Sequence, residues 1–104
     1  MMDAVIIDAI ASKISTEDII DQMIEECGEL IQACVKLKRA YKGTTPVTVN
    51  DARVDLVEEM ADVAVAHNVM MFGVLTAKER LKVGHVERRK LERWIDRIEK
   101  AGGA

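Results

Sequence analysis

The chain contains a single proline, Pro46, and it lies between two long stretches that have the periodicity of an α-helix. The segment Gly43–Pro46 combines residue types that end helices and form turns. On either side, residues 17–42 and 51–72 carry apolar side chains at helical spacing. Consecutive helices joined by a short connection pack side by side in opposite directions. The sequence therefore predicts an antiparallel pair of long helices.

Two further helices are predicted outside this pair. Residues 3–13 alternate aliphatic side chains with acids, which is typical of a short amphipathic helix that ends before Ser15. Thr76 and Glu79 have the spacing of a capping box, which predicts a last helix from there to about Arg97. Aromatic residues make up only 3% of the chain, which argues against a β-sandwich. We predict an all-α fold, a bundle of about four helices.

The length of 104 residues fits one domain over residues 1–104. The predicted helix 51–72 is apolar around most of its circumference, which is typical of a central, buried helix. Three other helices of so small a chain can hardly cover it and also hide the apolar edges of helix 17–42. We therefore expect a homo-oligomer in which a partner subunit completes the core.

Charge and hydropathy exclude several partners. The net charge of -3 argues against binding a nucleic acid polymer through a general positive field. The apolar stretches are far shorter than a membrane span, and the N-terminus lacks the basic flank and cleavage site of a secretory signal. We therefore expect a cytoplasmic protein without a membrane partner. Cys27 and Cys34 share one apolar helical pattern, and we interpret both as reduced core residues.

Acidic residues form a row on each of the two long helices. On the first, Gln22, Glu26 and Glu29 lie along one border of the apolar stripe, and Glu25 lies further toward solvent. On the second, five acids share one sector: Asp51, Asp55, Glu58, Glu59 and Asp62. If the two rows face each other, protons, basic side chains or divalent cations must relieve their repulsion. The alternative interpretation is that both acidic rows simply face solvent, as charged helix faces usually do.

Carboxylates spaced i,i+3 on two helices supply the all-oxygen ligand shell that Mg²⁺ or Mn²⁺ prefers. A carboxylate-bridged di-iron site is not favoured, because its helices carry ExxH pairs and this chain has none; His67 and His85 stand alone. The sequence has no P-loop, no Gly-rich phosphate cradle and no Ser/His/Asp arrangement. Nothing in it therefore supports covalent catalysis.

Two motifs resemble those of a known family. The segments Glu25–Glu29 and Glu59–Asp62 match the EExxE and ExxD motifs of the MazG-like all-α nucleoside triphosphate pyrophosphohydrolases. The wider strings IEECGELIQA and VEEMADV are also similar to small single-domain members. The resemblance covers about residues 17–97. It implies a Mg²⁺-dependent hydrolase that assembles as a dimer or tetramer.

In that family, both motifs bind magnesium ions that hold a nucleoside triphosphate. Water cleaves between the α and β phosphorus atoms, releasing a monophosphate and pyrophosphate. The resemblance implies that Glu25 is an auxiliary catalytic acid that orients water or a second metal. It implies that the catalytic metal ligands are Glu26, Glu29, Glu59 and Asp62. Mg²⁺ is the expected cofactor, and Mn²⁺ is a possible substitute.

Three further residues are candidates for contacts with the nucleotide. The string Lys90–Trp94 resembles the Lys/Arg-bearing C-terminal helix of the family, which implies phosphate contacts by Lys90 and Arg93. Asn68 follows Asp62 on the same helix, and an asparagine can read a base edge with both a donor and an acceptor. A buried hydrogen bond between helices is the alternative for Asn68.

Three functions remain open at this point. The first is a Mg²⁺-dependent nucleoside triphosphate pyrophosphohydrolase. A phosphoribosyl-ATP pyrophosphatase, or a dUTP- or dCTP-specific relative, would cleave the same bond. A non-catalytic helical interaction protein, whose acidic face binds a basic partner, belongs to a different class. An enzyme should need the divalent ion and release pyrophosphate, whereas a binding module would do neither.

Overall fold

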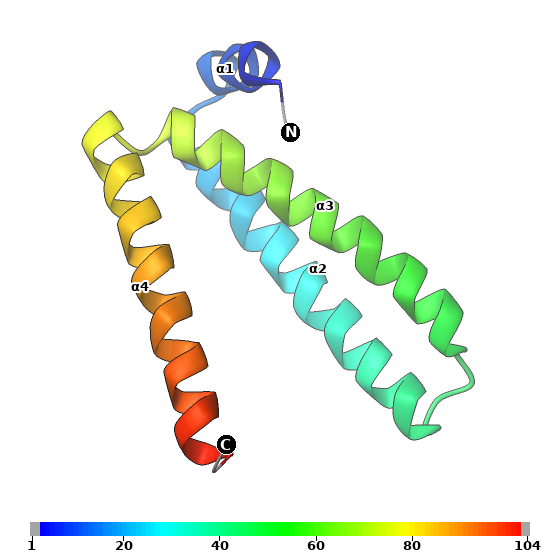
Figure 1. The fold of residues 1–104 in the computed structure, drawn as a ribbon. Helices are drawn as coiled ribbons and strands as arrows, with labels where there is room; N and C mark the ends of the chain where they lie inside the picture. The colour runs from blue at the N-terminus through cyan, green and yellow to red at the C-terminus, as the bar shows by residue number, and fades with distance from the viewer. Residues whose placement is uncertain (1–2, 103–104) are drawn as a thin grey trace. The chain divides into compact units, whose positions relative to one another are not determined.

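The computed structural model describes residues 3–102, which contain four α-helices (Figure 1). They are α1 (Ala4–Lys13), α2 (Thr16–Lys42), α3 (Val49–Gly73) and α4 (Ala77–Ala101). No strand occurs within residues 3–102, which confirms the prediction of an all-α chain with about four helices.

Contacts divide the chain into two units, one that holds α1, α2 and α3 and ends at Val74, and one that begins at Leu75 and holds α4. None of the residues of α4 is buried, so this helix has no core of its own. A lone helix is marginally stable in water. The division therefore does not contradict the prediction of one domain over residues 1–104.

Side-chain caps determine where the helices begin. Asp3, Ser15 and Thr48 accept hydrogen bonds from backbone N–H groups in the first turns of α1, α2 and α3. At α4 the predicted capping box is present. The Glu79 N–H donates to Thr76 Oγ1 at 3.2 Å, and the Thr76 N–H donates to Glu79 Oε1 at 2.9 Å. Hydrogen bonds from the backbone and side chain of Thr76 to the Glu79 carboxyl group lower its pKa.

The helices α2 and α3 lie side by side in opposite directions, which confirms the predicted antiparallel pair (Figure 1). Gly43 ends α2 with a φ of 70°, a left-handed conformation that favours glycine. Across the pair, Lys36 Nζ lies 2.9 Å from Asp55 Oδ2. The short helix α1 packs against α3.

The two long helices meet along residues spaced by seven, which is close to two helical turns. On α2 these are the buried residues Ile19, Glu26, Ala33 and Ala40. On α3 they are the buried Ala52 and Ala66 together with Glu59 and Gly73. We call these eight residues the α2–α3 seam. Most of them are alanine or glycine, so the two backbones can approach closely.

The apolar stripe that the sequence predicts as the core side of α2 is covered only in part: Met23, Leu30 and Leu37 are half-buried. Ile24 and Ile31 are 65% and 64% exposed, and Cys34, predicted in the core, is exposed. The helix α3 is not buried all round as predicted, because Val57 and Met60 are exposed. The physical reason is that α2 and α3 pack against each other through small residues, so each helix covers only a narrow strip of the other. Within residues 3–102, no helix combines the length and hydropathy needed to cross a lipid bilayer.

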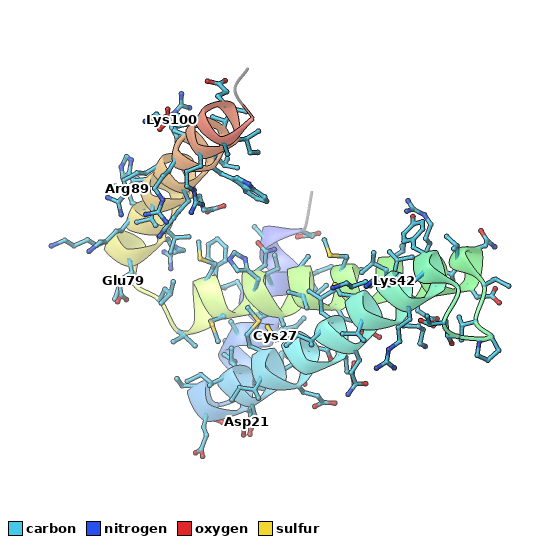
Figure 2. All side chains as sticks on the ribbon, turned by 90° about the horizontal axis from the view of Figure 1, so that it is seen from below. Asp21, Cys27, Lys42, Glu79, Arg89 and Lys100 are labelled. Atoms are coloured by element: carbon cyan, nitrogen blue, oxygen red, sulfur yellow. The ribbon has the colours of Figure 1, made fainter. Side chains whose placement is uncertain are left out.

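Figure 2 shows the side chains of the chain, with Cys27 midway along α2. Cys27 is half-buried, so it meets the expectation of a core position only in part. Both cysteines are free thiols, as expected for reduced residues.

An apolar core lies where α1 meets the end of the α2–α3 pair. Ile7, Ile19 and Val69 form it, one from each helix, and Ile19 is only 2% exposed. A Cβ atom built on Gly73 would lie 2.5 Å from Ile19 Cδ1 and 3.2 Å from the Ala11 Cβ atom. Gly73 therefore allows α1 and α2 to approach the end of α3.

Replacing Gly73 with alanine is expected to lower the free energy of unfolding by about 1 kcal/mol or more, because the added methyl group must displace Ile19, which is buried, and press on Ala11. This overpacking should outweigh the gain in helix propensity at the last residue of α3. Urea denaturation of the full chain measures this change. Gly28→Ala is the matched control, since its Cβ would meet nothing within 4 Å. Alanine there should stabilise α2 by up to about 1 kcal/mol. A Gly73→Ala variant as stable as the wild type would contradict the packing described.

Candidate metal centre

Four carboxylates from the middle of α2 and α3 meet at the seam. Glu26 and Glu29 lie one turn apart on α2, and Glu59 and Asp62 lie one turn apart on α3. One oxygen from each of the four side chains lies within 4.8 Å of the others. The two acidic rows therefore face each other, and the residues brought together are the four that the family resemblance implies as metal ligands.

Two oxygen atoms of this cluster are buried without a hydrogen-bond partner among the described residues. Glu26 is 8% exposed, and its Oε1 accepts a hydrogen bond from Gln22 Nε2 at 2.8 Å. Its other oxygen, Oε2, has no partner, and Glu59 Oε2 is in the same situation. Burying a carboxylate oxygen without a partner is costly and rare in folded proteins. A cation or a proton between these oxygens would remove that cost.

Burial and mutual repulsion both act on the acidity of the cluster. Burial raises the pKa of Glu26 above its ordinary value, and the nearby carboxylates of Glu29 and Asp62 raise it further. The hydrogen bond from Gln22 acts in the opposite direction. Burial also raises the pKa of Glu59, followed by repulsion from Glu29. Both shifts favour the protonated form of these two carboxyl groups when no metal is bound.

The cluster has no basic counterpart within its own unit. In the described part of α1–α3, Lys36 pairs with Asp55, and no basic side chain forms an ion pair with the four carboxylates. Among the described residues of this unit, protons and divalent cations are therefore the two remaining ways to relieve the repulsion. An all-oxygen set on two rigid helices suits Mg²⁺ or Mn²⁺. The residues present therefore fit the expected ion.

The other predicted site residues are placed as follows. Glu25 is exposed beside the cluster, and its negative charge contributes to the raised pKa of Glu26. Asn68 Nδ2 donates to the Ala64 carbonyl oxygen at 2.8 Å, so its amide bonds to its own helix and not to another. Lys90 and Arg93 lie on α4, in the other unit, and their contact with phosphate stays a prediction.

A pocket of about 300 Å³ opens beside the cluster within the α1–α3 unit. Glu26 and Asp62 form part of its wall, together with Gln22. The remaining wall is aliphatic and consists of Ile10, Ile14, Ile19, Val65, Ala66 and Val69. This pocket could not be predicted from the sequence, because two of its wall residues precede α2 and helical periodicity does not show how α1 packs.

The MazG-like resemblance rests on two short motifs in the sequence. Comparison with models of protein families, with curated proteins and with solved structures gives no match. The geometry of the four carboxylates, read together with those motifs, is therefore the basis for assigning a function.

In metal-free protein, Glu26→Gln is expected to raise the thermal midpoint at neutral pH. A carboxyl group with a raised pKa binds more protons in the folded than in the unfolded state, so wild-type stability rises as the pH falls from the raised to the ordinary pKa. Above that interval the ionised group destabilises the fold. Glutamine removes the charge and keeps an acceptor for Gln22, so its advantage should shrink as the pH falls.

Thermal unfolding with a chelator, measured between about pH 7 and pH 4, tests this expectation. Glu58→Gln is the matched control, because Glu58 is exposed and outside the cluster. It should give no gain that depends on pH in this way. A Glu26→Gln variant whose stability followed the wild type at every pH would contradict the description of the cluster.

Proposed function

We propose that this protein is a Mg²⁺-dependent nucleoside triphosphate pyrophosphohydrolase of the MazG-like kind. The observation that carries the proposal is the convergence of four carboxylates, two of which have buried oxygens without partners. The EExxE and ExxD motifs assign the metal to these same four positions. Substrates in which the same bond is cleaved, such as phosphoribosyl-ATP, dUTP or dCTP, fall within this proposal. We place the protein in the cytoplasm, where nucleoside triphosphates occur.

In this proposal, the four clustered carboxylates hold Mg²⁺, which Mn²⁺ can replace. The chemistry supplied by the bound ion is neutralisation of charge on the phosphates and a lowered pKa of the attacking water. Glu25, exposed next to the cluster, orients that water or a second metal. The water oxygen forms a bond to the α phosphorus and releases a proton to solvent, and pyrophosphate leaves with the electron pair of the broken P–O bond.

Contacts with the rest of the nucleotide are assigned to three residues. Lys90 and Arg93 on α4 are proposed to bind the phosphates through their positive charges. Asn68 is proposed to bind the base, which requires its amide to exchange the hydrogen bond to Ala64 for one to the substrate.

The partial burial of the cluster, in which Asp62 is exposed, argues for an enzyme over an acidic interaction protein. Recognition of a basic partner requires charges at the surface, whereas Glu26 is buried and Glu59 is half-buried. Asp55, in the same acidic sector, is already paired with Lys36. Divalent metal binding and pyrophosphate release separate the two functions.

We also propose that the protein is a homo-oligomer, a dimer or tetramer. Large aliphatic side chains are exposed on three helices: Ile24, Ile31 and Val35 on α2, Val54, Val57 and Met60 on α3, and Leu91, Ile95 and Ile98 on α4. Stable monomers rarely leave this many apolar side chains in water. A second copy of the chain offers matching aliphatic faces of the same helical length.

Light scattering at micromolar concentration is expected to give at least twice the 11.6 kDa mass of one chain. Val57→Asp should shift the population toward the monomer, because Val57 is 69% exposed and a charge there would be buried only by a partner. Circular dichroism checks that the variant remains helical. A wild type that is monomeric under these conditions would contradict the proposed assembly.

Asp62→Asn and Glu29→Gln are each expected to remove most of the turnover with nucleoside triphosphates. Each amide keeps the shape of the side chain but loses the negative charge that holds Mg²⁺. Measuring pyrophosphate and monophosphate release over a panel of triphosphates with Mg²⁺ tests this expectation. Chelation of the metal should abolish activity and leave the helices intact.

Asp55→Asn and Glu58→Gln are the matched controls for these variants. They belong to the same acidic sector of α3 but lie outside the cluster, so their effect should be milder. Orthophosphate as the sole product, or full activity in Asp62→Asn, would overturn the proposed function.

A further inference from the structure

The two oxygens of the Glu26 carboxylate have different surroundings. Gln22 lies one helical turn before Glu26 on α2, where side chains four residues apart are neighbours. Its Nε2 donates to Glu26 Oε1 at 2.8 Å, while Glu26 Oε2 is buried without a hydrogen-bond partner among the described residues. One oxygen is therefore already engaged, and the other is free to bind a ligand.

We propose that Gln22 is a positioning residue for the metal centre: it holds one oxygen of Glu26 so that the other is presented as a single-oxygen ligand. The inference rests on the proposed function only in that the cluster binds a divalent ion. It assigns Gln22 no contact with the ion or with the reacting phosphate.

Restricting Glu26 in this way matters because of the geometry that the ion demands. A glutamate side chain has several rotatable bonds, and a free carboxylate can bind through one oxygen or both. Mg²⁺ requires near-octahedral geometry and keeps some of its positions for water and phosphate oxygens. A hydrogen bond that occupies Oε1 reduces this freedom before the ion binds. Residues that orient metal ligands in this way commonly affect metal affinity by about 10–100-fold.

An amide is well suited to this position. It donates a hydrogen bond without adding charge, whereas a lysine would compete with the cation and an acid would add to the repulsion. The side-chain amide oxygen of Gln22 accepts no hydrogen bond from the described residues. The hydrogen bond to Glu26 is therefore the one that this side chain makes among them. Removing Gln22 should therefore act on Glu26 and little else.

Mn²⁺ binding without nucleotide, measured by the loss of the electron paramagnetic resonance signal of the free ion, tests the proposal. Gln22→Met keeps the length of the side chain and removes the donor, and Gln22→Ala removes both. Each is expected to weaken Mn²⁺ binding by about tenfold. Gln32→Met is the matched control, an exposed glutamine on the same helix outside the cluster, and should bind Mn²⁺ as the wild type does.

Two measurements separate positioning from a general structural role. Gln22 is exposed, so helix content by circular dichroism should be unchanged in both variants. Gln22→Met combined with Glu26→Gln should bind Mn²⁺ no more weakly than Glu26→Gln alone, because the ligand that Gln22 orients is already lost. A further loss in the double variant would overturn the inference.

The remaining outcomes distinguish this inference from the proposed function. Mn²⁺ affinity in Gln22→Met equal to that of the wild type would overturn the role of Gln22 and leave the hydrolase intact. Weaker binding in the variant, with no pyrophosphate released by the wild type, would support Gln22 and overturn the hydrolase. A wild type that binds no Mn²⁺ would overturn both.

Discussion

The repulsion among four carboxylates held between α2 and α3 is the interaction on which the rest of this structure depends. Two of the acids, Glu26 and Glu59, occupy the seam itself, at positions where an ordinary helix pair would place aliphatic side chains. Their burial raises their pKa values and leaves one oxygen of each without a partner. Like charges gathered at a partly buried position destabilise a metal-free fold and are typical of a functional site.

The same constraint explains the aliphatic faces that the unit leaves open. Because alanine, glycine and acids occupy the seam, α2 and α3 bury little apolar surface against each other. The apolar core of the unit lies at one end, where Ile7, Ile19 and Val69 meet. Ile24, Ile31 and other large aliphatic residues are displaced to the flanks. The acidic cluster between two helices and the open aliphatic faces thus arise from the same choice of seam residues.

The helices and the position of each acidic row on its own helix could be predicted from the sequence, because both follow from local spacing. Whether the two rows meet could not be predicted, because spacing along one helix does not say which neighbour faces it. The capping box at Thr76 and the left-handed Gly43 each act within one turn of the chain. The side of α2 that faces α3 was predicted only in part, because Leu30 is half-buried as expected but Ile31 is exposed. Helical periodicity places Ile31 and Ala33 around the axis but does not say which neighbour covers each face, and small residues at close contact carry almost no hydrophobic signal.

Gln22 and Asn68, the two amide side chains discussed for the candidate site, show what local spacing can predict and what it cannot. Gln22 has a carboxylate four residues ahead on its helix, and its side chain is long enough to reach it. Asn68 has Ala64 four residues behind, and its shorter side chain bonds to that backbone carbonyl. Both spacings are visible in the sequence. The hydrogen-bond partner of Gln22 follows from its spacing to a motif carboxylate, whereas a contact between Asn68 and a base depends on a substrate that spacing does not specify.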